Sequence, residues 1–223
     1  MPDIYIKEFK FNTRVTPSEI PFFRASICQL SEGCENGLMH NHAGEGLRYG
    51  YPLVQYRSVG NTGVIYAVNQ GIDEVNRIDL TKKQTIAIGN RKRTLELVDT
   101  HTGTFSIDFI NPPAFYTIEN WLPFSSDNEK LYGNLQNLVE RVMFLERILT
   151  ANMLSFAKGV GIHLDQEIKV SVCDIKSTKK LAYKSIMFDA FDLSFSANLN
   201  LPDGIGIGKH MSHGFGVVRR QTT

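Results

Sequence analysis

Three consecutive stretches decide the expected fold: LVQYRSV at residues 53–59, GNTG at residues 60–63 and VIYAV at residues 64–68. The outer two are rich in β-branched and aromatic residues, which fit a pleated strand, whereas the glycines and asparagine between them favour a tight reversal. We therefore predict two antiparallel strands, over residues Leu53 to Val59 and Val64 to Val68, joined as a hairpin.

The elements on either side of this hairpin complete a known order. Residues 1–14 alternate between apolar and polar side chains, which predicts a strand. The capping sequence Thr16-Pro17-Ser18-Glu19 then precedes apolar residues at helical spacing, which are Ile20, Phe23, Ile27 and Leu30. After the hairpin, residues 71–75 open a short helix and residues 84–98 return to strand character. The resulting order of strand, helix, strand, strand, helix and strand is ferredoxin-like.

The second half of the chain predicts a similar unit with a longer helix. Residues 105–109 alternate, and Asn111-Pro112-Pro113 should interrupt regular structure. A long helix is expected from Asp127 to Lys158, because Ser126 and Glu129 form a capping box and apolar residues recur at helical spacing, namely Leu131, Leu135, Leu138, Val142, Leu145 and Leu149. This apolar stripe packs on a sheet or, as the alternative, joins two copies of the chain in a homodimer. Residues 167–175, 184–199 and 217–220 are expected strands.

Together these elements predict an α+β protein with two tandem ferredoxin-like (RRM-like) domains, in which antiparallel sheets carry their helices on one face. We place the N-terminal domain at residues 1–99 and the C-terminal domain at residues 100–223. A chain of 223 residues with 42% hydrophobic and 21% charged residues is long enough and apolar enough to bury two such cores.

Charge and cysteine content narrow the class of protein. A net charge of +1 gives little support for a polyanionic partner, but residues Lys82 to Arg93 contain five cations and no acid. Within that stretch Arg91, Lys92 and Arg93 are candidate nucleic-acid contacts, against the alternative of a solvated face.

Three cysteines without C-x-x-C spacing predict neither a disulfide framework nor a zinc finger. Because no long apolar segment is found, we expect a cytoplasmic protein without a membrane partner.

Two histidines, His40 and His42, form the first chemical motif. In an extended segment, residues i and i+2 project to the same side, so the two imidazoles can act on one reaction. One can take the proton of a ribose 2′-hydroxyl while the other protonates the departing 5′-oxygen, because an unperturbed histidine has a pKa of about 6.5. Two alternatives remain open: a structural role, and metal binding with Cys34 or Glu45, although neither stands at a recognisable ligand spacing.

A glycine-rich segment at residues 206–216, GIGKHMSHGFG, forms the second motif. Glycines allow positive φ angles and let backbone N–H groups approach a phosphate, and Lys209 supplies a charge that favours an anion. The glycines alone are a weak signal, because a turn between two strands has a similar composition. The segment is not a nucleotide-binding P-loop, since the sequence lacks the G-x-x-x-x-G-K-[ST] pattern.

These two motifs together resemble the CRISPR-associated endoribonucleases that cut repeat RNA into guide units. The histidine pair followed by Y-x-Y-P-L-x-Q-Y, here residues 49–56, resembles one branch, and the G-h-G-x5-G-h-G segment is similar to the glycine-rich loop of the whole superfamily. The resemblance implies two ferredoxin-like domains, in agreement with the element order above. It further implies a metal-independent enzyme without a cofactor, whose products carry a 2′,3′-cyclic phosphate and a 5′-hydroxyl.

Carried over to this chain, the resemblance implies that His40 and His42 are the catalytic pair and that Tyr49 orients or stabilises the reacting phosphate. Many relatives have a basic residue between the two tyrosines, where this chain has Gly50, and Arg48 is the candidate substitute. The RNA backbone would lie on Lys209 and the glycines of the loop, which are Gly206, Gly208, Gly214 and Gly216. His210 and His213 either reach the phosphate from that loop or face solvent.

Two other functions stay open. The chain could bind CRISPR repeat RNA as a structural subunit that remains on the processed guide and meets other subunits of an interference complex, which suits its near-neutral net charge. It could also be a metal-dependent hydrolase in which His40 and His42 are ligands. Turnover with excess repeat RNA separates the first alternative from the enzyme, and activity in excess chelator separates the second.

Overall fold

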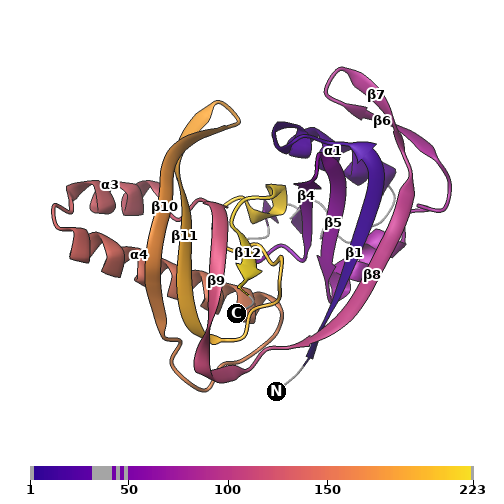
Figure 1. Cartoon of the computed structure of the whole chain (residues 1–223). Helices are drawn as coiled ribbons and strands as arrows, with labels where there is room; N and C mark the ends of the chain where they lie inside the picture. The colour runs from indigo at the N-terminus through magenta and orange to yellow at the C-terminus, as the bar shows by residue number, and fades with distance from the viewer. Residues whose placement is uncertain (1–2, 32–41, 44–45, 48–49, 222–223) are drawn as a thin grey trace. The chain divides into compact units, whose positions relative to one another are not determined.

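The computed structural model describes residues 3–31, 42–43, 46–47 and 50–221 (Figure 1). The chain divides into two compact units. The N-terminal unit holds Asp3–Phe105 together with Ser212–Gly214, and the C-terminal unit holds Ser106–Met211 and the stretch that begins at Phe215. Three residues of the glycine-rich segment are therefore part of the N-terminal unit.

The N-terminal unit is built on one sheet with two helices on one face (Figure 1). Its elements are β1 (Asp3–Arg14), the 3-10 turn η1 (Pro17–Glu19), α1 (Ile20–Leu30), β4 (Val54–Val59), β5 (Thr62–Val68), α2 (Gln70–Asn76) and β8 (Leu97–Ser106). The strands lie in the order β4-β5-β1-β8, which is the ferredoxin-like order. Two small hairpins are separate from this sheet: β2 (His42–Ala43) with β3 (Gly46–Leu47), and β6 (Gln84–Ile88) with β7 (Arg91–Leu95).

The central hairpin and the first helix form as predicted. β4 and β5 pair antiparallel, and the pairing of Val59 with Thr62 leaves Gly60 and Asn61 as the turn. Both have positive φ angles, of 57° and 60°, as a two-residue hairpin turn requires. The capping sequence predicted at Thr16 to Glu19 forms a capping box at the start of η1. The Thr16 side chain accepts from the Glu19 backbone N–H, and the Glu19 carboxylate accepts from the Thr16 backbone N–H.

The core of the N-terminal unit lies between the sheet and α1. Phe23 of α1 meets Phe11 of β1 and Tyr56 of β4 edge to face, at centroid distances of 5.8 and 6.0 Å. All three rings are fully buried. Gly63 in β5 is needed for this packing, because a Cβ there would lie 2.8 Å from the Phe23 ring.

The prediction for the final strand of the N-terminal sheet, at residues 84–98, was wrong. Residues 84–98 do not form one strand, because Gly89, at φ 59°, reverses the chain and splits them into β6 and β7. The strand that completes the sheet is β8, whose residues are mostly exposed. Its polar sequence therefore gave no signal of apolar alternation.

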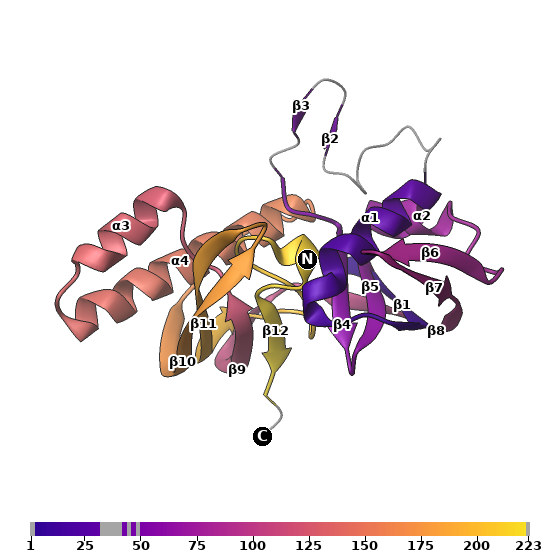
Figure 2. The same ribbon diagram turned by 90° about the horizontal axis from the view of Figure 1, so that it is seen from above.

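The C-terminal unit repeats the strand order of the first. Its elements are β9 (Phe109–Trp121), α3 (Ser126–Asn134), α4 (Leu138–Gly159), β10 (Val170–Tyr183), β11 (Ile186–Leu199) and β12 (Val217–Arg220), with the short 3-10 turn η2 (Met211–His213) before β12. The antiparallel strands lie in the order β10-β11-β9-β12, and α3 and α4 cover one face (Figure 2). Between β11 and β12, where a second ferredoxin-like helix would lie, the chain forms the glycine-rich segment instead. The predicted α+β class with tandem ferredoxin-like units is confirmed.

Three local predictions in the C-terminal unit were wrong, and a fourth was right only in part. The partly correct one concerns Asn111-Pro112-Pro113: the strand β9 continues through this segment, but its ladder with β11 is irregular there, because the pairing register shifts between Phe109 and Ala114. The expected long helix is two helices, because Asn137 begins α4 by accepting a hydrogen bond from the backbone of Val139. The cap of α3 is Ser125 and not Ser126. Lys184 belongs to the turn between β10 and β11, with a φ of 47°.

Candidate functional site

One histidine of the motif, His42, lies in a small hairpin of the N-terminal unit. His42 is the first residue of β2 and pairs with Leu47 of β3. His40, Arg48 and Tyr49 lie outside the described residues, as do Cys34 and Glu45 of the metal hypothesis. Within the described ranges, no three His, Cys, Asp or Glu side chains gather closely enough to hold a metal ion.

The segment that follows this hairpin is anchored by a buried chain of hydrogen bonds. The Gln55 amide, which is fully buried, donates to the Tyr51 hydroxyl at 2.8 Å and accepts from the Arg57 guanidinium at 3.1 Å. Arg57 in turn lies 4.1 Å over the Tyr66 ring. Burial raises the pKa of Tyr51 well above its usual value, so its hydroxyl stays protonated. The second tyrosine and the glutamine of the motif are therefore structural in this arrangement.

Leu53 fixes the same segment to the start of α2. Its carbonyl accepts from the backbone N–H of Val68 at 2.8 Å. A Cβ at Gly71, in the first turn of α2, would lie 2.4 Å from that carbonyl oxygen, so only glycine fits. The segment at residues 51–55, which follows β3 in the chain, is therefore held by both side-chain and backbone contacts.

The glycine-rich segment is shaped by close approach to its own unit. Gly208 has a φ of 95°, and a Cβ there would lie 2.6 Å from the Trp121 indole nitrogen. Gly216 has a φ of 64°, and a Cβ would lie 1.9 Å from the carbonyl oxygen of Ile207. The Ile207 N–H also donates to the Gly216 carbonyl at 2.9 Å. Internal packing thus accounts for Gly208 and Gly216. A third glycine of the segment, Gly206, forms an isolated antiparallel β-bridge with Val217.

His213 is buried in the N-terminal unit and does not face solvent, contrary to one of the two predicted alternatives. Arg24 of α1 donates to its Nε2 at 3.2 Å, so this nitrogen is an acceptor. The proton then sits on Nδ1, which donates to the Ser212 hydroxyl at 3.1 Å. Beside it, a Cβ at Gly214 would lie 3.1 Å from the Tyr56 carbonyl oxygen. Both nitrogens of the neutral ring are therefore used inside the unit.

His210 lies in the C-terminal unit among aromatic rings. Its ring centroid is 4.3 Å from that of Tyr183, 5.2 Å from Phe188 and 6.4 Å from Phe215. Burial lowers its pKa, and the nearby charges of Lys209 and Lys184 lower it further. The charges of Lys209 and Lys184 thus lie close enough to His210 to favour its neutral form, and the two ammonium groups would suit an anionic ligand. Tyr183, Phe188 and Lys184 were missed because they come from the distant β10–β11 hairpin, whereas Phe215 belongs to the glycine-rich segment itself.

The basic stretch at residues 82–93 is largely neutralised by acids from elsewhere in its unit. Three ion pairs form: Lys82 with Asp79 at 3.3 Å, Lys83 with Glu96 at 2.7 Å and Arg93 with Glu19 at 2.6 Å. Arg91 and Lys92 are exposed on β7 and make no ion pair with any residue that the structure describes. Of the three predicted contacts in this stretch, these two present a charge to solvent.

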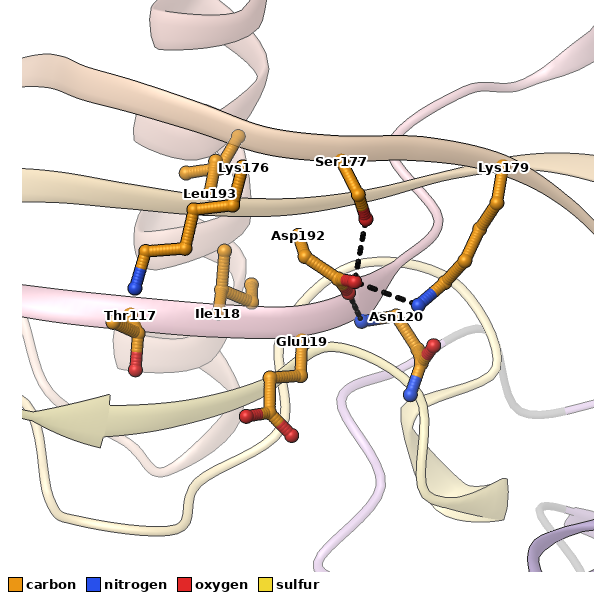
Figure 3. Close-up of a pocket in the computed structure, with 9 residues that line it drawn as sticks. All are labelled: Thr117, Ile118, Glu119, Asn120, Lys176, Ser177, Lys179, Asp192 and Leu193. Atoms are coloured by element: carbon orange, nitrogen blue, oxygen red, sulfur yellow. Dashed lines mark hydrogen bonds and ion pairs between the residues drawn. The ribbon is translucent and has the colours of Figure 1, made fainter.

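A pocket of about 300 Å³ lies on β9, β10 and β11, and no predicted site residue lines it (Figure 3). The Asp192 carboxylate at its centre accepts from the Asn120 backbone N–H at 2.6 Å, the Ser177 hydroxyl at 2.7 Å and the Lys179 ammonium at 2.6 Å. Burial opposes its ionisation, but these hydrogen bonds outweigh that effect and lower the pKa of Asp192. The pocket has no excess of positive charge, because its two lysines, Lys176 and Lys179, are balanced by the carboxylates of Glu119 and Asp192.

Solved structures that are similar over nearly the whole chain define the class of this fold. The chain matches "Crystal structure of Cas6b" with a TM-score of 0.89 and 21% identity, covering 99% of this chain and 100% of that one. It matches "Crystal structure of CRISPR RNA processing endoribonuclease Cas6b" with a TM-score of 0.75 and 18% identity, at the same coverage. The match to "Csf5, CRISPR-Cas type IV Cas6 crRNA endonuclease" has a TM-score of 0.58 and 14% identity, again over 99% and 100%. At these identities the likeness establishes the fold, which is that of Cas6 proteins.

Sequence models identify the family within that class. The Cas6b N-terminal domain matches residues 3–106, and the Cas6b C-terminal domain matches residues 100–221. The chain therefore belongs to the Cas6b family, and the resemblance predicted from the two motifs is confirmed. Among curated proteins, the uncharacterized protein MJ0978 of Methanocaldococcus jannaschii is 33% identical over 100 residues, which are 44% of this chain and 67% of that protein. No helix among the described residues is both long and apolar enough to cross a membrane.

Proposed function

We propose that this chain is a metal-independent endoribonuclease that cuts CRISPR repeat RNA. The observation that carries the proposal is the match of both Cas6b domain models, which together span residues 3–221. It is supported by the full-length likeness to a structure titled as a CRISPR RNA processing endoribonuclease. The substrate would be the repeat transcript, cut once within the repeat.

In the proposed mechanism, His40 and His42 divide the roles of general base and general acid. The base takes the proton of a ribose 2′-hydroxyl, whose oxygen attacks the adjacent phosphorus and displaces the 5′-oxygen of the next nucleotide. The acid protonates that leaving oxygen. The products are then a 2′,3′-cyclic phosphate and a 5′-hydroxyl. Tyr49 would orient or stabilise the reacting phosphate, with Arg48 as a cation beside it.

RNA binding would use cations of both units. In the C-terminal unit, Lys209 and Lys184 flank the neutral His210, whose ring can also contact a base or ribose. In the N-terminal unit, Arg91 and Lys92 are exposed charges on β7. Arg93 and His213 are excluded from this proposal, because Glu19 and Arg24 already engage them.

The test is cleavage of a repeat RNA in excess chelator, with ribose or 2′-deoxyribose at the nucleotide before the cut. We expect the all-ribose substrate to be cut fully and the deoxy substrate to remain intact, with the cyclic phosphate identified by mass spectrometry. Cleavage of the deoxy substrate, or a requirement for added metal, would exclude the mechanism. The amount of product formed from excess RNA also measures turnover. An amount of product equal to the amount of protein added would identify a subunit that retains its product.

A further inference from the structure

The pocket on β9, β10 and β11 lies on the face of the C-terminal sheet that the helices do not cover. Lys180 of β10 reaches Glu129 of α3 at 3.8 Å, so it projects toward the helices. Neighbouring residues of a strand point to opposite faces, so Ser177 and Lys179 project to the other face. Both donate to the Asp192 carboxylate there (Figure 3). The volume of about 300 Å³ is at the lower end of the range for pockets that hold a small molecule.

Two β-bulges shape this pocket. In the pairing of β9 with β11, Glu119 and Asn120 together lie opposite Asp192 alone. In the pairing of β10 with β11, Lys176 is an extra residue between two paired ones. Asn120 also has a φ of 49°, which a regular strand does not adopt. A bulge redirects side chains out of the regular pleat, and here the bulged residues of both strands line the pocket.

The β9 bulge is held by hydrogen bonds of its own. The Asn120 N–H donates to the Asp192 carboxylate at 2.6 Å, and the Gly216 N–H donates to the Glu119 carbonyl at 3.1 Å. The Asp192 carboxylate therefore has a structural task already. The side chains of Glu119 and Lys176 are exposed, and neither forms a hydrogen bond or an ion pair within the described ranges (Figure 3). These two side chains are available to a ligand.

The charges of the pocket favour a neutral ligand that both donates and accepts hydrogen bonds. Two lysines balance two carboxylates, so an anion such as phosphate gains little. The Glu119 carboxylate can only accept hydrogen bonds, and the Lys176 ammonium can only donate them. Among the four RNA bases, guanine alone has two adjacent N–H donors, at N1 and N2, next to an oxygen acceptor, O6. One carboxylate can accept from both donors, and lysine is a usual partner of guanine O6 and N7.

We infer that this pocket is a binding site for an unpaired guanine of the bound RNA. Glu119 accepts from guanine N1 and N2, and Lys176 donates to O6 or N7. The inference rests on the proposed function for the identity of the polymer and adds a base preference to it, since unpaired bases are recognised along these edges. The guanine is not the nucleotide beside His210, because Tyr183, which contacts that ring, is about 20 Å from Ser177 along β10.

Nuclear magnetic resonance of the RNA-free full chain tests the site by itself. The probes are the 5′-monophosphates of guanosine, adenosine, cytidine and uridine, all of which carry the same phosphate. We expect guanosine monophosphate to shift the backbone N–H signals of Asn120 and Ser177 at an about tenfold lower concentration than the other three, and Glu119→Gln to remove that preference. A response that is equal for all four nucleotides, or no response at all, would overturn the inference.

Base substitution in the repeat RNA tests the same contact in the complex. Inosine lacks the N2 amino group, so replacing each guanine in turn should reveal one position at which the affinity of the parent chain falls about five- to tenfold. At that position inosine should cause no further loss in Glu119→Gln. Glu140→Gln, which changes an exposed residue of α4, is the matched control and should retain the full effect of inosine. If the effect of inosine depends on Glu119 at no guanine, the inference is wrong.

Cleavage in the same reactions distinguishes this inference from the proposed function. Repeat RNA that is cut normally, with no guanine coupled to Glu119, refutes only the base site. Repeat RNA that is bound through such a guanine but left uncut supports the base site and refutes the endoribonuclease.

Discussion

Replacement of Arg93 by methionine should destabilise the N-terminal unit and leave RNA affinity close to that of the parent chain. The guanidinium donates to both carboxylate oxygens of Glu19, at 2.6 and 3.0 Å, and to the backbone carbonyl of Arg14. Glu19 also accepts from the backbone N–H of Thr16 at 2.9 Å. Arg93 therefore connects β7 to the start of the first helix.

The magnitude follows from burial and geometry. The side chains of Arg93 and Glu19 are 15% and 22% exposed, so the pair lies between the exposed and the buried case. Exposed pairs contribute about 0.2–1 kcal/mol, and breaking a buried pair costs about 3–5 kcal/mol. We expect Arg93→Met to lower the free energy of unfolding by about 2 kcal/mol, since Glu19 keeps its capping bonds.

Urea unfolding at pH 7 and repeat-RNA binding at two salt concentrations measure the two effects. Lys92→Met is the matched control, because the neighbouring side chain is exposed. It should change stability by less than about 0.5 kcal/mol and should lower the RNA affinity and its salt dependence. A normal unfolding free energy for Arg93→Met, together with a tenfold loss of RNA affinity, would show that Arg93 contacts RNA and would refute this reasoning.

Hydrogen bonds, first from Arg93 and then from Thr16, lower the pKa of Glu19 from 4.5 to about 2, so they should stabilise the fold above about pH 4.5 and lose that effect as the pH falls toward 2. Urea unfolding between these pH values should show a smaller slope for Arg93→Met, and an unchanged slope would contradict the assignment. Gly216→Ala should lower the free energy of unfolding by at least about 2 kcal/mol, because the φ of Gly216 is positive and a Cβ would overlap the Ile207 carbonyl. In the same urea unfolding measurement, Gly103→Ala should be nearly neutral, because a Cβ there meets open space. Gln55→Leu should cost about 2 kcal/mol, because it removes buried hydrogen bonds with Tyr51 and Arg57. Thermal unfolding checks this loss, and an unchanged unfolding temperature would contradict the structural role of Gln55.

Sequence patterns were sufficient where a buried apolar face decides the structure. α1 follows from Phe23 and Ile27, and the β4–β5 hairpin follows from the β-branched and aromatic residues around Tyr56 and Ile65; these four side chains lie in the core. β8 was misplaced because its residues are mostly exposed and carry no apolar period. The break between α3 and α4 was missed because the apolar spacing continues across it, while the local cap of Asn137 decides the geometry.

The candidate site was only partly predictable for a different reason. The motifs identified the family, since their spacing is visible along the chain. The surroundings of individual residues depend on contacts between distant segments, such as Arg24 with His213, which are 189 residues apart. For the same reason, the acids that neutralise Lys82, Lys83 and Arg93 were not visible within the basic stretch itself.

The most direct test of the proposed chemistry is the single-turnover rate of repeat cleavage in chelator for His40→Ala and His42→Ala. His101→Ala, which removes an exposed histidine on β8, is the matched control. We expect each motif variant to cut about 10²- to 10⁴-fold more slowly with unchanged RNA affinity, while the control cuts at the parental rate. Cleavage at the parental rate by both motif variants would show that these two imidazoles do not perform the reaction.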